Sequence, residues 1–117
     1  MEKYIQIRNN DKIVIYKLNE SEAAKELYGL LPIKNAVENF SHNEKIVYLP
    51  KSLNIENTPK STHGIETLSY FASWDNLVFY YDEFGPYPGL YKLGECVQGQ
   101  KNIKEFKGIV EITKYQK

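Results

Sequence analysis

The chain opens with two short segments in which large apolar side chains recur at every second position. Ile5 and Ile7 do so in the first segment, and Val14, Tyr16 and Leu18 do so in the second. A period of two with β-branched residues predicts strands. The Asn-Asn-Asp run between the segments favours a tight reversal, so we expect an antiparallel hairpin at the start of the chain.

A helical periodicity follows over residues 20–30. Apolar side chains recur there at three- and four-residue steps, at Ala24, Leu27, Tyr28 and Leu31. Asn19 and Glu22 have the spacing of a capping box, which would begin the helix near residue 20. Pro32 ends it, because proline has no amide proton and restricts the residue before it. We expect a short helix that is held by packing of its apolar stripe.

The rest of the chain alternates short apolar segments with turn residues. The expected strands are 33–40, 45–49, the two halves of 68–81 around Asp75-Asn76, 91–97 and 108–114, with a helical turn at 102–106. Residues 51–64 carry few large apolar side chains, which predicts a long loop. Seven or eight short strands with two helices favour a mainly β fold closed into a barrel, because closure removes exposed sheet edges.

Length and charge narrow the class of protein. A chain of 117 residues predicts one domain over 1–117. Fifteen basic and fifteen acidic residues balance, so charge gives no reason to expect nucleic acid or a membrane surface as partner. No apolar run approaches the ~20 residues that span a bilayer, and the N-terminus lacks the apolar run of a signal peptide. Together with the solitary Cys96, this predicts a cytoplasmic protein.

The motifs of readily recognised enzyme classes are missing from the sequence. It contains no glycine-rich phosphate loop, nucleophile elbow or His-Glu-x-x-His. His42 and Glu44 have the His-x-Glu spacing of zinc deaminases, but the Pro-Cys-x-x-Cys that completes such a site does not occur. The spacing of His63 from other ligand types matches no metal pattern either. We expect no metal site, no cofactor and no catalytic residue of these kinds.

Aromatic side chains are crowded into residues 70–91. Tyrosine and tryptophan join an apolar ring to a polar tip, which suits a pocket or an interface, although any single ring could instead fill the barrel interior. The prolines at 86 and 88 interrupt regular sheet and favour exposure of the rings beside them. We predict a ligand-binding cleft rimmed by the loops 51–64 and 86–91. The predicted binding residues are His63, Tyr70, Trp74, Tyr81, Phe84, Tyr87 and Tyr91.

Several short motifs occur in an order that carries a family resemblance. They are Leu30-Leu31-Pro32, Asn43-Glu44-Lys45, Tyr48-Leu49-Pro50, Tyr70 to Trp74 with Asn76-Leu77, Tyr81 with Phe84, and Leu93-Gly94. In this order and spacing the chain resembles the bacterial cyclophilin-like fold family of small uncharacterised proteins. The resemblance implies a closed β-barrel of about eight strands, capped by two short helices.

The resemblance does not carry over an isomerase site. In true cyclophilins, an arginine contacts the amide of the substrate proline and lies within a block of phenylalanine, methionine and glutamine. Here Arg8 is the only arginine, it lies in the first expected strand, and no Phe-Met-x-Gln run occurs. Lysine replaces a planar, forked guanidinium poorly. We expect binding of a small molecule or peptide segment without strong catalysis.

Two alternatives to simple binding stay open at this point. One is a peptidyl-prolyl cis-trans isomerase with a non-standard site. The other is an accessory or self-associating subunit, with a homo-oligomer formed through the aromatic loop and a role beside a redox protein. Peptide-isomerisation kinetics and light scattering separate these alternatives from the first hypothesis.

Overall fold

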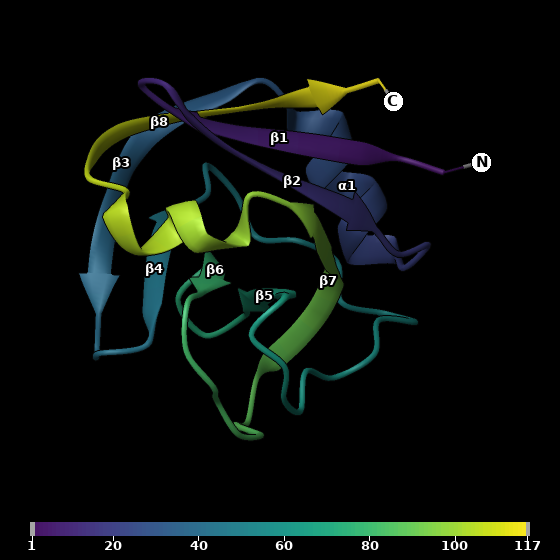
Figure 1. Ribbon diagram of the computed structural model, residues 1–117. Coiled ribbons are helices and arrows are strands. Elements are labelled where there is room, and N and C mark those ends of the chain that lie inside the picture. Colours follow the sequence, from purple (N-terminus) through teal and green to yellow (C-terminus); the bar gives the residue numbers. More distant parts are fainter. Residues whose placement is uncertain (1, 117) are drawn as a thin grey trace.

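The computed structural model describes residues 2–116, and this part of the chain forms a closed antiparallel β-barrel (Figure 1). Its strands are β1 (Tyr4–Asn9), β2 (Lys12–Leu18), β3 (Ile33–Phe40), β4 (Glu44–Tyr48), β5 (Thr67–Phe71), β6 (Asn76–Tyr80), β7 (Leu90–Gln98) and β8 (Gly108–Tyr115). The helices are α1 (Glu22–Leu30) and the 3-10 helix η1 (Gln100–Glu105). The order around the barrel is β1-β2-β7-β5-β6-β4-β3-β8, and β8 pairs with β1 to close it. The mainly β, closed barrel with two short helices is confirmed.

The opening hairpin has the predicted form. Tyr4 of β1 pairs with Lys17 of β2, and the register runs without interruption to the pair Asn9 and Lys12. Asn10 in the turn has φ of 59°, a left-handed conformation that asparagine tolerates.

The central aromatic hairpin is also present, but its reversal comes earlier than expected. Phe71 of β5 pairs with Asn76 of β6, so residues 72–75 form the turn and Trp74 lies in it rather than in a strand. Asp75 has φ of 55° and accepts a hydrogen bond from the Tyr70 hydroxyl at 2.7 Å. This hydrogen bond holds the turn in place. Because the turn spans 72–75 and Asn76 already belongs to β6, the expectation of a reversal centred on Asp75-Asn76 is wrong.

Helix α1 begins two residues after the predicted start, and the predicted capping box is wrong. Ser21 is the N-cap, and its Oγ accepts a hydrogen bond from the backbone N–H of Ala24 at 3.2 Å. Asn19 accepts from the N–H of Ser21 and donates to the carbonyl of Lys92 at 2.7 Å, so it ties the helix entry to β7. The apolar stripe, with Leu27 at its centre, packs as expected into the apolar cluster that fills the barrel interior, which we call the main core.

The barrel wall separates two apolar clusters. The larger cluster fills the interior and contains the predicted inward side chains of the opening hairpin. The smaller cluster lies on the outside, where Ile46, Val78, Tyr80 and Leu90 pack with the partly buried Phe71 and Phe84. All five residues of β6 are therefore buried. A strand covered on both faces is apolar without alternation, and here the cover on the outer face is the segment 81–89.

The expected long loop is confirmed between β4 and β5, and it is anchored to the barrel. Leu53 is buried in the main core, and its backbone N–H donates to the Tyr70 hydroxyl at 3.0 Å. Lys60 forms an isolated bridge with Tyr91 of β7. Within the described residues, no helix is long and apolar enough to cross a membrane.

Candidate functional site

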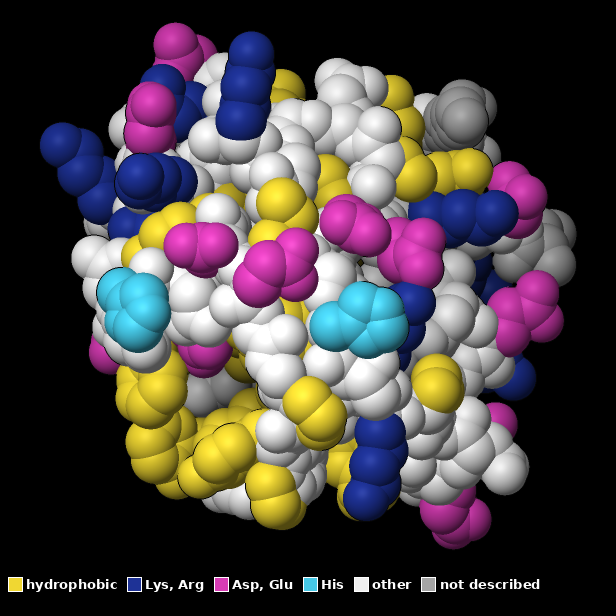
Figure 2. All heavy atoms as spheres, turned by 60° about the horizontal axis from the view of Figure 1, so that its bottom comes forward, with side chains coloured by type: hydrophobic (Ala, Val, Ile, Leu, Met, Phe, Trp, Pro, Cys, Tyr) yellow, Lys and Arg dark blue, Asp and Glu magenta, His cyan; other side chains and the backbone are white. Residues whose placement is uncertain are grey.

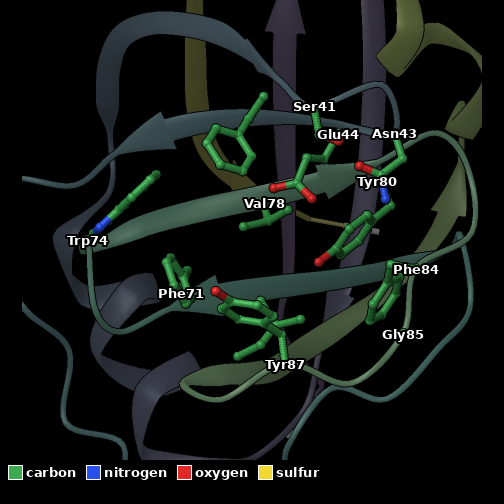
Figure 3. Close-up of a pocket in the computed structure, with 12 residues that line it drawn as sticks. Ser41, Asn43, Glu44, Phe71, Trp74, Val78, Tyr80, Phe84, Gly85 and Tyr87 are labelled. Atoms are coloured by element: carbon green, nitrogen blue, oxygen red, sulfur yellow. The ribbon is translucent and has the colours of Figure 1, made fainter.

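A hollow of about 330 Å³ lies on the outer face of the barrel, over β4, β6 and β5 (Figure 3). Its lining residues are Phe40, Ser41, Asn43, Glu44, Phe71, Trp74, Val78, Tyr80, Phe84, Gly85, Tyr87 and Leu90. Strand register explains the grouping, because Glu44 pairs with Tyr80 and their side chains point to the same outer face. Figure 2 shows hydrophobic side chains gathered around a hollow at one edge of the molecule. We call this hollow the outer pocket.

Two connecting segments build the sides of the outer pocket. The β3–β4 turn is held by Asn43, whose Nδ2 donates to the carbonyl of Glu83 at 3.1 Å and whose carbonyl accepts from the N–H of Tyr81 at 3.0 Å. In the segment 81–89, Gly89 has φ of 85° and its carbonyl accepts from the N–H of Ala72 at 2.9 Å. A side chain at Gly89 would also meet Ser73 Oγ at 3.2 Å, so glycine allows the close approach of these turns.

Aromatic rings at varied angles form most of the pocket wall. The ring of Trp74 lies edge-on to Phe40 at 5.3 Å between centroids and to Phe71 at 5.6 Å. Phe71 also contacts Tyr87 at 5.7 Å, again in a T-shaped arrangement. Such angles suit the ring quadrupoles and hold the rings apart as a bowl instead of a flat stack. Trp74 and Tyr87 remain 48% and 64% exposed, so the bowl is open to solvent.

The opposite wall is more compact. Tyr80 and Phe84 stack at 3.8 Å between centroids with 9° between their planes. This stacking attaches the segment 81–89 to β6. Burial, and next the nearby charge of Glu44, raise the pKa of the Tyr80 phenol, so this hydroxyl stays protonated at neutral pH.

Glu44 is the charged group of the outer pocket. Its carboxylate extends over Val78, with Trp74 toward one end of the hollow and the Tyr80 and Phe84 rings toward the other (Figure 3). Among residues 2–116, no side chain forms an ion pair or hydrogen bond with this carboxylate. Burial among apolar groups raises the pKa of Glu44 to about 7, because it disfavours the charged form.

A second acceptor beside Glu44 also lacks a donor. The Oδ1 atom of Asn43 is buried and has no hydrogen-bond partner within the described part of the chain. Buried acceptors are normally satisfied, so an unpaired one at a pocket wall indicates a place where a ligand donor or water can bind. The outer pocket therefore combines an apolar wall with converging acceptors, which is the usual composition of a ligand site.

Sequence comparison assigns the family. A model described as the cyclophilin-like family matches residues 7–114. The chain belongs to the cyclophilin-like family. The solution structure of a hypothetical protein from Archaeoglobus fulgidus is similar to this cyclophilin-like barrel, with a TM-score of 0.69 over 96% of this chain and 94% of that one. Sequence identity is 16%, so the likeness concerns the fold alone. No curated protein matches the chain in sequence.

The cyclophilin-like barrel brings some of the predicted binding residues together and separates others. Trp74, Phe84 and Tyr87 line the outer pocket. Tyr70 is 1% exposed and lies in the barrel interior, where burial raises the pKa of its hydroxyl to about 12. Tyr81 is half-buried against the interior cluster. Neither it nor Tyr91 lines the outer pocket.

The long loop does not form a wall of the outer pocket. His63, expected at the cleft, is exposed in that loop, where its Nδ1 and the Thr62 hydroxyl are 3.0 Å apart. The loop instead packs against β7 through the bridge between Lys60 and Tyr91, and it inserts Leu53 into the main core. The wall expected from residues 51–64 is supplied by the β3–β4 turn.

Sequence reasoning missed nine of the twelve lining residues, among them Phe40, Asn43, Glu44 and Phe71, which supply rings and both unpaired acceptors. Glu44 carried a usable signal, because it stands at every-second-residue spacing with Ile46 at the start of a strongly apolar strand. A carboxylate in that position falls on the same face as an apolar residue. The rings of Phe71 and Trp74 come from the β5–β6 hairpin, so they approach Glu44 only when β4 and β6 pair in the barrel.

The cyclophilin-like chain places its only arginine away from the outer pocket. Arg8 is exposed on β1, which pairs with β2 and β8, whereas the outer pocket lies over β4, β6 and β5. Cys96 is half-buried, its thiol donates to the carbonyl of Gln98 at 3.4 Å, and burial raises the pKa of that thiol. A protonated thiol is a poor nucleophile.

Proposed function

We propose that this cyclophilin-like barrel binds a small molecule or a short peptide segment in the outer pocket, without strong catalysis. One observation carries the proposal: an aromatic-walled hollow of about 330 Å³ that contains a carboxylate and an amide oxygen, both without partners in the described residues. Its volume is within the range of known ligand pockets. Burial of a bare carboxylate against rings is unfavourable for folding alone, which favours a binding role.

The polar groups of the outer pocket do not favour proline isomerisation. The barrier to rotation about a peptide bond is ~20 kcal/mol, and a strong donor directed at the twisting amide would lower it. None of the residues that line the outer pocket carries a guanidinium or an ammonium group, and its one charged group, the Glu44 carboxylate, is an acceptor. The tyrosine hydroxyls are weaker donors than a guanidinium. Strong isomerase activity is therefore not expected.

Trp74 supplies a direct test, because it is the single tryptophan and lies in the outer pocket. Its indole N–H gives one resolved signal in a nitrogen-proton correlation spectrum. We expect a saturable shift of this signal, and of the Glu44 amide, on titration with benzyl alcohol or a proline-containing tetrapeptide. Isomerisation of the same tetrapeptide should proceed at its uncatalysed rate.

A matched control is Ile109→Ala, which removes an exposed apolar side chain of β8 outside the outer pocket. It should leave the titration curves unchanged. Binding is contradicted if neither these probes nor the charged ones described below produce a saturable shift at millimolar concentration, or if the shifts fall on other faces. Acceleration of isomerisation that is lost in Trp74→Ala would replace the proposal by the isomerase alternative.

Exposure of the aromatic bowl favours one alternative to ligand binding, which is self-association. Trp74 and Tyr87 could bury their rings against a second copy, since exposed aromatic clusters are typical of interfaces. Light scattering of the native chain and of Tyr87→Glu tests this. A dimer that dissociates in the variant would assign the bowl to an interface, whereas a monomer in both leaves it free for ligand.

A further inference from the structure

The charged side chains in and beside the outer pocket are predominantly acidic. Of its lining residues, all within the described part of the chain, Glu44 is the only charged one and none is basic. Lys45, the next residue, points to the opposite face and lies over the Tyr81 ring at 6.0 Å. Asp82 and Glu83 are exposed in the segment 81–89 that forms a pocket wall. The surroundings therefore attract positive charge and repel negative charge.

The ring arrangement fits a compact cation. Phe40, Phe71, Trp74 and Tyr87 line the hollow and meet at angles between 61° and 87°, so they form a curved wall and not a flat stack. The face of an aromatic ring carries negative electrostatic potential and attracts ammonium groups, and a cage of several rings with a carboxylate is a common way to bind them. The unpaired Oδ1 of Asn43 adds an acceptor for any N–H or O–H of the guest.

We propose that the ligand of the outer pocket is a small organic cation, recognised through an ammonium group that sits in the aromatic bowl against the Glu44 carboxylate. This inference rests on the proposed binding function and names the chemical class of its ligand. The ammonium group could belong to a free metabolite-sized molecule or to a lysine side chain. Both sources present the same charge and similar volume, so separate arms of one experiment distinguish them.

The titration of Glu44 makes cation binding depend on pH. With a pKa of about 7, the carboxyl is largely neutral in mildly acidic solution and ionised in mildly basic solution. The groups that face or flank it are Tyr80 from β6, Asp82, Glu83 and Tyr87 from the segment 81–89, and His42 from the β3–β4 turn. A bound cation stabilises the ionised carboxylate, so affinity should rise with pH and binding should release a proton below neutrality.

The experiment uses two probes of equal shape. Choline carries a trimethylammonium group, and 3,3-dimethylbutan-1-ol replaces its nitrogen by carbon. Both are titrated into the native chain while the Trp74 indole signal and the Glu44 amide are followed. We expect choline to bind at least about tenfold more tightly at a pH of about 8, and this preference to shrink toward pH of about 5.5. N-acetyl-lysine methylamide forms the second arm, and the tighter of the two cations identifies the source.

Variants separate charge recognition from ring contact. Glu44→Gln keeps the shape of the side chain and should lower choline affinity about tenfold while leaving the neutral alcohol unaffected. Glu38→Gln, on the exposed face of β3 and outside the lining, is the matched control and should change neither. Spectra of both variants verify that the barrel is folded.

The outcomes are distinct. If the alcohol binds as tightly as both cations, or if Glu44→Gln leaves cation affinity unchanged, the inference is overturned while the proposed binding function stands. If neither cation binds and the neutral probes do, the inference is likewise overturned. If no probe of either charge binds, both the inference and the proposed function fail.

Discussion

Glu44 is the residue whose chemistry is changed most by its surroundings in the barrel. On a solvated strand end it would be an ordinary surface carboxylate, but the rings packed around β4 and β6 exclude part of its water. This loss of hydration disfavours the charged form and raises the pKa of Glu44 to about 7. Since no partner among residues 2–116 offsets this cost, the native chain carries a destabilising charge at the site we assign to binding.

This cost predicts a pH-dependent stability. The carboxyl has a pKa near 4.5 without burial and about 7 in the barrel, so its contribution is most favourable below 4.5 and is lost as pH rises to 7. Glu44→Gln should raise the free energy of unfolding by about 1–2 kcal/mol at a pH of about 8.5, because water in the open pocket screens part of the charge. Near pH of about 4.5 the difference should vanish.

Urea unfolding at both pH values measures this effect. Glu38→Gln again serves as the control, since Glu38 is exposed on β3, and it should give the same stability difference at both pH values. Equal stability of the native chain and Glu44→Gln at the higher pH would contradict a desolvated carboxylate.

At the scale of elements, the approach of β2 to β7 depends on a residue without a side chain. Gly94 of β7 pairs with Leu18 of β2 on one side and with Leu68 of β5 on the other. A Cβ at this position would clash with the carbonyl oxygen of Lys17 and meet the Leu18 Cα at 3.0 Å. Both clashing atoms belong to backbone, so neither can rotate away.

Two glycine substitutions therefore have opposite expected effects. Gly94→Ala should lower the free energy of unfolding by about 2–3 kcal/mol, because β2 and β7 must separate locally. Gly29→Ala, in α1, meets nothing within 4 Å and should raise it by about 0.5–1 kcal/mol through helix propensity. Thermal and urea unfolding of both variants measure the difference. A neutral Gly94→Ala would show that the strands can move apart at no cost.

At the scale of the whole molecule, the barrel wall divides the aromatic residues into two groups. Tyr70 faces inward, where its hydroxyl bonds Asp75 and the N–H of Leu53. Trp74, only four positions away, lies outside in the bowl. Their proximity in sequence gives no sign of this separation, because it depends on where β5 ends and the turn begins.

This division predicts that stability and binding respond to different residues. Tyr70→Phe leaves a buried N–H and a carboxylate without their partner, which should cost about 1–3 kcal/mol of stability while choline affinity is unchanged. Trp74→Ala should cost less than about 1 kcal/mol but reduce binding several-fold, because its ring is half exposed. Urea unfolding and titration followed at the Glu44 amide give the two quantities. Weakened binding in Tyr70→Phe would place the site inside the barrel instead.

The sequence by itself determined the elements and the type of fold. Alternation in the opening hairpin, the apolar stripe of α1 and the sparse loop before β5 are local patterns, and the interactions that produce them lie within a few residues. They sufficed for a closed barrel with two short helices. The start of α1 and the reversal after Phe71 differ from prediction because Asn19 and Asp75 form hydrogen bonds outside their own segments, to the carbonyl of Lys92 and from the N–H of Leu49.

Only the tertiary structure decided which face of each strand meets which loop. The outer pocket joins the β5–β6 turn and the segment 81–89, which flank β6, to the β3–β4 turn, which is distant in sequence but brought beside them because β4 pairs with β6. Trp74, Phe84 and Tyr87 were predicted as rings near a proline-rich bend, and the spacing of Glu44 from Ile46 carried a signal for its face, whereas nothing local indicated Phe40 or Asn43. Long-range pairing selects these neighbours, and a burial-induced pKa shift exists only once they are assembled.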